Sequence, residues 1–464
     1  MAGKKLSVFD AFFLAAETRE AMMHVGGLLI FTPPADAHPQ LLRHLANELR
    51  AEVAIYPPWN QRLWTPELLK NPLQAWIEDK DVDLEYHVRR SALPAPGDER
   101  ELGILVSRLH SVPIDFHRPP WEVHFIEGLE GGRFAMYFKI HHALVDGFTS
   151  MKLLARSLSV DPDDRDTPMF FARPGRTRAP TGGDPEPAPT FERLWGAVRE
   201  QLGATREAGR AIMNVVRSRQ AGDRGLVAPM AAPRTLLNRR ISRNRRFATQ
   251  QYDLERLRRL AKASGGTIND VALAVCGGAL RRYLREQDEL PAEPLTAMLP
   301  VNTRPKDDPG GGNAVGAILC SLATDVDLPV ARLDAVMTST RRAKDQLAGM
   351  SRSAIMQYSA ALMAPLAMQQ MPTAANWLRP AFNVVVSNVP GPEQRLYFRG
   401  ARLDALYPLS IPYHGQGLNI TINGYCGTLN FGFTGCRDAV PSLQRLAVYS
   451  GDEVSALEQA LGVA

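Results

Sequence analysis

The sequence predicts an α/β or α+β protein of two halves, each with a mixed sheet flanked by helices. Strand-like and helical patterns are mixed in each half, and a Pro- and Gly-rich stretch separates the halves. The 464 residues are also too many for one ordinary domain. Hydrophobic residues make up 45% of the chain and charged residues 22%, which is the balance of an ordinary globular protein.

Residues 1–165 form the expected N-terminal half. Runs at 25–31 and 133–140 are rich in strand-forming residues, and helical spacing of apolar residues occurs at 41–53 and 101–112. This mixture of strands and helices predicts an α/β or α+β domain.

Residues 166–235 are expected to connect the two halves. The stretch 161–190 is rich in Pro, Gly, Asp and Arg, which is typical of a linker. Residues 191–219 then place apolar side chains at helical spacing, with arginines on the other face. This segment is either a connecting helix packed on the protein or a basic amphipathic helix that touches anionic lipid.

Residues 236–464 form the expected C-terminal half. A helical pattern at 254–266 ends in two glycines, and Thr267 is placed to cap a second helix that is apolar nearly all round. Later runs with strand character lie at residues 295–301, 317–326, 381–390, 417–424 and 428–435.

Charge and cysteine content narrow the function classes. The net charge of +5 and the pI near 9.0 suit an anionic ligand or membrane surface but are far from a nucleic-acid-binding signature. The four cysteines are far apart and form no CxxC pair, which indicates reduced core thiols in a cytoplasmic protein. We expect no signal peptide, and no transmembrane helix because no apolar run reaches about 18 residues.

The stretch FKIHHALVDGFTS contains His141, His142, Asp146 and Gly147. Adjacent residues of a strand point to opposite faces, so the two histidines would not enter one cavity, and a metal site made from this pair is disfavoured. Gly147 ends the strand and opens a helical pattern, which places the motif at a strand-to-helix corner. A side chain can project into a cleft at such a corner, although a buried structural histidine is the alternative for each position.

The segment HHALVDG resembles the HHxxxDG signature of CoA-dependent acyltransferases of the chloramphenicol acetyltransferase-like superfamily. Further blocks resemble the bacterial wax ester synthase/diacylglycerol acyltransferase family, in order along nearly the whole chain. They are SVFDAFFLAAE, MMHVGGLLIF, RPPWEVHFIEGL, TINDVALAV, LPVNTRP, GNAVG and VVSNVPGP. The chain departs from the usual Pro-Leu-Trp of the family at Pro119-Pro120-Trp121, which puts the detail of the acyl pocket in doubt.

The resemblance implies two chloramphenicol acetyltransferase-like domains around a central cleft. It also implies transfer of a fatty acyl group from acyl-CoA to a long-chain alcohol, giving wax ester, or to diacylglycerol, giving triacylglycerol. His142 would be the general base, since a neutral imidazole can take the hydroxyl proton during attack on the thioester. His141 and Asp146 would support the corner, and Gly147 would relieve crowding. Acyl-CoA is then a co-substrate, and neither a separate cofactor nor an acyl-enzyme is expected.

Asn269 and Asp270 start a predicted helix, where they either help to stabilise an oxyanion or merely cap the helix. Arginines at 234–247 either bind the CoA phosphates or form a solvated surface. The candidate substrate-binding residues are Pro120, Trp121, Arg239, Arg240, Arg245, Arg246, Asn302 and Arg304.

The Met- and Ala-rich stretch 353–372 either lines an acyl tunnel or packs in the core. Candidate partners besides the substrates are the inner-membrane or lipid-droplet surface and a second copy of the chain. Two alternative functions are a condensation-type acyltransferase that uses a carrier-protein thioester and a non-catalytic lipid-binding relative.

Overall fold

The computed structural model describes most of the chain. The described residues are 4–6, 8–51, 54–64, 75–145, 154–172, 209, 211, 213, 217, 225–228, 230–302, 315–369 and 379–463. The stretch 161–190 and the helical pattern at 191–219 therefore lie largely outside the described residues.

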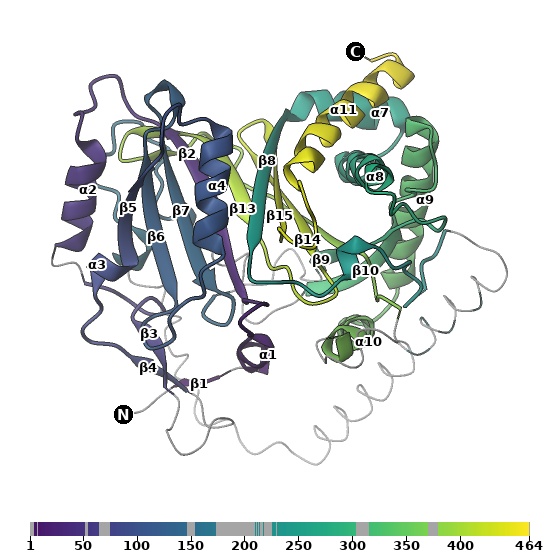
Figure 1. The fold of residues 1–464 in the computed structure, drawn as a ribbon, viewed down its shortest axis with the longest axis horizontal. Helices are drawn as coiled ribbons and strands as arrows, with labels where there is room; N and C mark the ends of the chain where they lie inside the picture. The colour runs from purple at the N-terminus through teal and green to yellow at the C-terminus, as the bar shows by residue number, and fades with distance from the viewer. Residues whose placement is uncertain are drawn as a thin grey trace.

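Six strands form the first large sheet, in the order β12-β13-β2-β7-β6-β5 (Figure 1). They are β2 (His24–Thr32), β5 (Val88–Ala92), β6 (Trp121–Glu127), β7 (Phe134–His141), β12 (Tyr397–Phe398) and β13 (Ala401–Leu409). Neighbouring strands are antiparallel, except that β5 and β6 run parallel. The strands predicted at 25–31 and 133–140 are confirmed as β2 and β7, which pair with each other.

Helices cover both faces of this sheet, because side chains of a strand alternate between its faces. On one face, Leu29 and Phe31 pack in a cluster with leucines of α2 (Leu41–Arg50). On the other face, Leu28 and Ile30 pack with leucines of α4 (Glu99–His110). A short helix, α3 (Leu84–His87), precedes β5. The helices predicted at 41–53 and 101–112 are confirmed as α2 and α4.

The second large sheet has the strand order β10-β9-β11-β14-β15-β8. Its strands are β8 (Arg245–Asp253), β9 (Thr296–Asn302), β10 (Val315–Ser321), β11 (Val384–Val389), β14 (Leu418–Tyr425) and β15 (Thr428–Cys436). The helices of this half are α7 (Leu254–Ser264), α8 (Ile268–Glu286), α9 (Pro329–Leu347), α10 (Arg352–Gln369) and α11 (Gln444–Leu461). Val384 and Val386 of β11 share a core cluster with residues of α7, α8, α9 and α11, while Val385 joins a cluster with α10.

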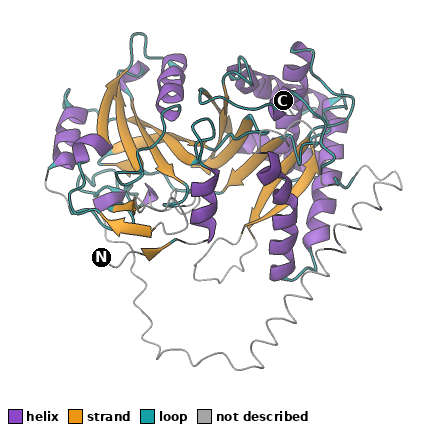
Figure 2. Cartoon of the chain, turned by 60° about the horizontal axis from the view of Figure 1, so that its bottom comes forward, coloured by secondary structure: helices purple, strands orange, loops and turns teal. Residues whose placement is uncertain are grey.

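A third, small sheet has the order β1-β4-β3 and lies near the N-terminus. Its strands are β1 (Lys4–Lys5), β3 (Gln61–Trp64) and β4 (Ala75–Glu78). Helix α1 (Val8–Ala16) follows β1 and lies beneath the junction of the two large sheets in Figure 1. Figure 2 shows the same arrangement from below, with α1 between the two halves and most other helices toward the outside.

The C-terminal half contributes a segment of chain to the first sheet. Residues 397–409 lie within the predicted C-terminal half, but their strands β12 and β13 belong to the first sheet, where β13 pairs with β2. The backbone of β13 then passes close to the second sheet at Gly432, where an added Cβ would lie 2.0 Å from the carbonyl oxygen of Pro408. Alternation of side chains predicts a strand but does not predict its partner.

Candidate active site

Strand β7 ends at His141, at the point where the chain leaves the first sheet. His141 pairs with His24 in the register between β7 and β2, and its backbone N–H donates to the carbonyl of Pro120 at 3.0 Å. The backbone N–H of His142 donates to the carbonyl of Met23 at 2.9 Å. The corner that carries the two histidines is thus fastened to the segments that precede β2 and β6.

The side chain of His141 is sealed in the structure, with no solvent exposure. Its Nδ1 accepts a hydrogen bond from the backbone N–H of Ala143 at 3.2 Å, so the proton of the neutral ring lies on Nε2. Nε2 is 3.3 Å from Oε2 of Glu17, and the edge of the ring meets Phe116. His141 therefore closes the turn that follows it.

Glu17 is a site residue to which the sequence analysis assigned no role. Its carboxylate accepts hydrogen bonds from the His141 ring and from the backbone N–H of Met23, whose carbonyl holds the N–H of His142. It thereby links both histidines to the start of β2. Two sequence signals were present, an acid directly after an apolar helical run and its place at the end of the family block SVFDAFFLAAE, but neither identifies the groups that Glu17 contacts.

His142 differs from its neighbour because it is half-buried rather than sealed. Its ring stacks on the ring of Phe13 in α1, with the centroids 3.9 Å apart and an interplanar angle of 26°. Two facing aromatic rings of this kind restrict how far the imidazole can rotate. Asp146 and Gly147, the other two residues of the motif, lie outside the described residues.

Trp121 is a core residue, and its role in substrate binding stays a prediction. It has no solvent exposure, its Nε1 donates to the carbonyl of Trp59 at 2.7 Å, and its ring stacks on His87. Pro120 is also buried, and its carbonyl accepts from the N–H of His141. Both residues thus support the corner from the side of β6.

Asp270 acts as a helix cap, which is one of the two readings that the sequence left open. Thr267 and Asp270 form a capping box at the start of α8, and the hydroxyl of Thr340 donates to Asp270 at 2.6 Å. Burial pushes the pKa of Asp270 upward, but the hydrogen bonds from Thr340 and Thr267 outweigh it and bring that pKa below its usual value. Asn269 is half-buried at the second position of the helix, and its donation to an oxyanion stays a prediction.

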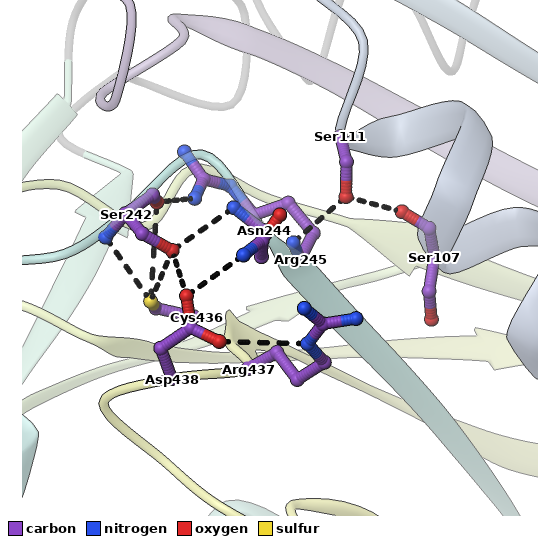
Figure 3. Close-up of polar contacts among 8 residues, drawn as sticks. All are labelled: Ser107, Ser111, Ser242, Asn244, Arg245, Cys436, Arg437 and Asp438. Carbon is purple, nitrogen blue, oxygen red and sulfur yellow. Dashed lines mark hydrogen bonds and ion pairs between the residues drawn. The ribbon is translucent and has the colours of Figure 1, made fainter.

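Arg245 is buried and bonded to backbone carbonyls, and its role as a phosphate ligand stays a prediction. Its guanidinium donates to the carbonyl of Ser242 at 2.6 Å, and its backbone N–H donates to Oγ of Ser111 at 2.8 Å (Figure 3). The guanidinium also donates to the carbonyl of Glu20 at 2.5 Å. Burial lowers the pKa of Arg245 to about 10, so the side chain stays charged at neutral pH. It fastens β8 to α4 and to the segment before β2.

The other predicted arginines are more accessible. Arg239 and Arg240 are exposed, although Arg239 is paired with Glu289, and Arg246 is half-buried in β8. These side chains remain candidates for binding an anionic group. The side chain of Asn302, and all of Arg304, lie outside what the structure describes.

The four cysteines are free thiols, and all but Cys426 are buried. Burial raises the pKa of Cys276 and Cys320 to about 12 each. Among the described residues, no group of three or more His, Cys, Asp or Glu side chains is arranged to hold a metal ion. No helix in the described part of the chain combines the length and apolar character needed to cross a bilayer.

The two-sheet fold places the chain in a known structural class. It superposes on the first condensation domain of the calcium-dependent antibiotic synthetase with a TM-score of 0.58 at 20% identity, covering 99% of this chain and 96% of that one. This similarity shows that the two proteins share a fold of two halves with mixed sheets.

Sequence comparison identifies the family within that class. Residues 6–272 match the model of the wax ester synthase/diacylglycerol acyltransferase catalytic domain, and residues 311–458 match that of the WS/DGAT C-terminal domain. The chain therefore belongs to the WS/DGAT family of acyltransferases.

Individual relatives cover nearly the whole chain. A putative diacylglycerol O-acyltransferase of Mycobacterium tuberculosis is 52% identical, over 99% of this chain and 98% of the relative. The solved wax ester synthase/diacylglycerol acyltransferase of Marinobacter aquaeolei superposes with a TM-score of 0.78 at 37% identity, over 99% of this chain and 100% of that one.

Proposed function

We propose that the protein transfers a long-chain acyl group from acyl-CoA directly to the hydroxyl of a fatty alcohol or of diacylglycerol. His142 takes the hydroxyl proton while the oxygen attacks the thioester carbonyl, and a C–O bond forms. The tetrahedral intermediate then breaks its C–S bond, and the imidazolium returns the proton to the CoA thiolate. The products are an ester and free CoA, and the step needs neither an acyl-enzyme nor a separate cofactor.

The contrast between the two histidines of the motif carries this proposal. In a chain of the WS/DGAT family, His142 is half-buried at the strand end, while the His141 ring is sealed and engaged with Glu17 and Ala143. A general base must reach the substrate hydroxyl, and of the two residues His142 is the one that is not fully buried.

The proposal also includes the binding of both substrates. Exposed Arg240 and half-buried Arg246 would attract the CoA phosphates, because guanidinium groups bind phosphate oxygens well. The apolar acceptor would come from a membrane or lipid-droplet surface, to which the protein would attach peripherally.

The test measures release of free CoA thiol from palmitoyl-CoA, with hexadecanol and with dioleoylglycerol as separate acceptors. We expect His142→Ala to lose nearly all activity with both acceptors. His117→Ala is the matched control, because that imidazole is 88% exposed in the loop before β6 and should be dispensable. Activity in His142→Ala close to that of the unmodified protein would end the assignment.

The same assay separates the alternatives. Turnover of free palmitoyl-CoA without a carrier protein would exclude dependence on a carrier-bound thioester. If the unmodified protein bound lipid but released no thiol with either acceptor, it would be a non-catalytic relative. The ratio of the two acceptor rates would show whether wax ester or triacylglycerol is the preferred product.

A further inference from the structure

Helix α1 and the residue that directly follows it present two side chains to the two histidines of the corner. Phe13 stacks on His142, and Glu17, one helical turn later, accepts a hydrogen bond from His141. The backbone N–H of Glu17 donates to the carbonyl of Phe13 at 3.1 Å, so the two residues lie on the same side of the last helical turn. One short helix and the residue after it therefore contact both imidazoles.

The ring of Phe13 is held in place by its surroundings. It packs against the core cluster of the second half and also against a small cluster that contains Ala143, the residue after His142. A ring supported from two sides keeps its face toward the imidazole. The centroid distance of 3.9 Å and the angle of 26° describe face-to-face contact rather than an edge contact.

This geometry has a chemical consequence if His142 is the general base, as proposed above. The imidazole is neutral before the reaction and becomes a cation when it takes the hydroxyl proton. The face of a phenyl ring carries negative electrostatic potential and attracts a cation within about 6 Å. The interaction is therefore stronger in the transition state than in the ground state, which is the condition for accelerating the chemical step.

We propose that Phe13 is a positioning residue that orients His142 and stabilises its protonated form through the face of the ring. The test compares Phe13→Leu, Phe13→Met and Phe13→Tyr in the thiol-release assay with palmitoyl-CoA and hexadecanol. We expect kcat to fall about tenfold in the Leu and Met variants, with KM changed less than about twofold. Phe13→Tyr keeps an aromatic face and should retain kcat.

A second measurement isolates the electrostatic part. Mono-, di- and trifluorinated phenylalanine at position 13 keep the shape of the ring but withdraw charge from its face. We expect kcat to fall stepwise with the number of fluorine atoms, an effect that a purely structural role would not produce. The matched control is Leu14→Ala, since Leu14 lies on the same helix and packs against the same small cluster as Phe13.

The outcomes separate this inference from the proposed function. If His142→Ala is inactive but Phe13→Leu keeps kcat, or if fluorination has no effect on kcat, the role of Phe13 is wrong and the general base stands. If His142→Ala is active, His142 is not the general base, and the proposed function fails whatever the Phe13 variants show. A variant that does not fold is recognised by its melting curve, and the fluorinated series then decides.

Discussion

The corner at 141–143 and the arginine-rich segment at 234–247 were both singled out by their residue types, yet the structure treats them differently. The corner is a single unit, held by backbone bonds to Pro120 and Met23 and by the carboxylate of Glu17. The arginine-rich segment divides, because one arginine is buried among carbonyl groups while others face solvent. The fixed spacing of the histidine motif therefore predicted where its residues lie in the fold. The number of arginines in a segment did not predict which of them are buried.

The largest expected effect concerns the corner. Glu17→Ala removes the acceptor for both the His141 ring and the N–H of Met23, so the backbone that carries His142 loses two restraints. We expect kcat for thiol release to fall about 100-fold, since small displacements of a catalytic group have effects of this order. Glu17→Gln keeps one acceptor oxygen and should recover part of the loss. Equal activity of Glu17→Ala and the unmodified protein would show that the corner needs no such support.

The next effect concerns the buried arginine of the other region. Arg245→Met keeps most of the side-chain volume but leaves the carbonyls of Ser242 and Glu20 without their donor. We expect the free energy of unfolding to fall by about 2 kcal/mol, the cost of buried unsatisfied polar groups. Urea denaturation measures it. Arg243→Met, at an exposed position of the same segment, is the control, and an equal loss in both variants would contradict the distinction.

Acid should also destabilise the half of the protein that carries the corner, because its residues His87 and His110 are buried. Burial lowers the pKa of His87 to about 4 and that of His110 to about 3, while the histidines of the unfolded chain titrate near 6.5. Below pH 6.5 the unfolded chain binds protons that the folded protein does not, so stability falls as the pH falls. Each histidine should contribute about 1.4 kcal/mol per pH unit until its folded pKa is reached.

Urea midpoints between pH 7 and pH 5 measure this loss, and His110→Gln should flatten the slope. An unchanged slope in that variant would mean that other groups control acid sensitivity.

The smallest effect concerns the exposed arginines. Arg240→Ala should raise KM for palmitoyl-CoA about threefold at low salt, because an exposed charge pair contributes roughly 0.2–1 kcal/mol to binding. The free energy of unfolding should stay nearly unchanged, because the side chain is exposed. The increase should shrink at high salt. Arg258→Ala, at an exposed arginine of α7, is the control. A similar rise in KM for both variants would remove the assignment of CoA phosphates to this segment.

Local features of the fold followed from the sequence. The capping box of Thr267 and Asp270 and the left-handed Gly265 define a helix start and a helix end from neighbouring residues alone, and both lie where they were predicted. The strands β9, β11, β14 and β15 also match their predicted runs closely. In each case the residues that form the sequence pattern are the same residues that form the helix end or the strand.

Features that depend on distant residues did not follow from the sequence. The partnership of β13 with β2, the burial of Arg245 and the contacts of Glu17 each join segments far apart in the chain. The core position of Trp121 likewise depends on Trp59 and His87. Residue type and spacing carry no information about contacts between distant segments. The sequence can therefore indicate which residues form a site, but not how the fold brings them together.

The pairing of β13 with β2 also constrains the order of events during protein synthesis. The first sheet contains His141, but its strand set is incomplete until the ribosome has translated at least as far as Leu409. Until then, the edge of β2 from Gly26 to Thr32 lacks its partner and is open to wrong pairing. The nascent N-terminal half must therefore wait for most of the polypeptide to emerge before its sheet is finished.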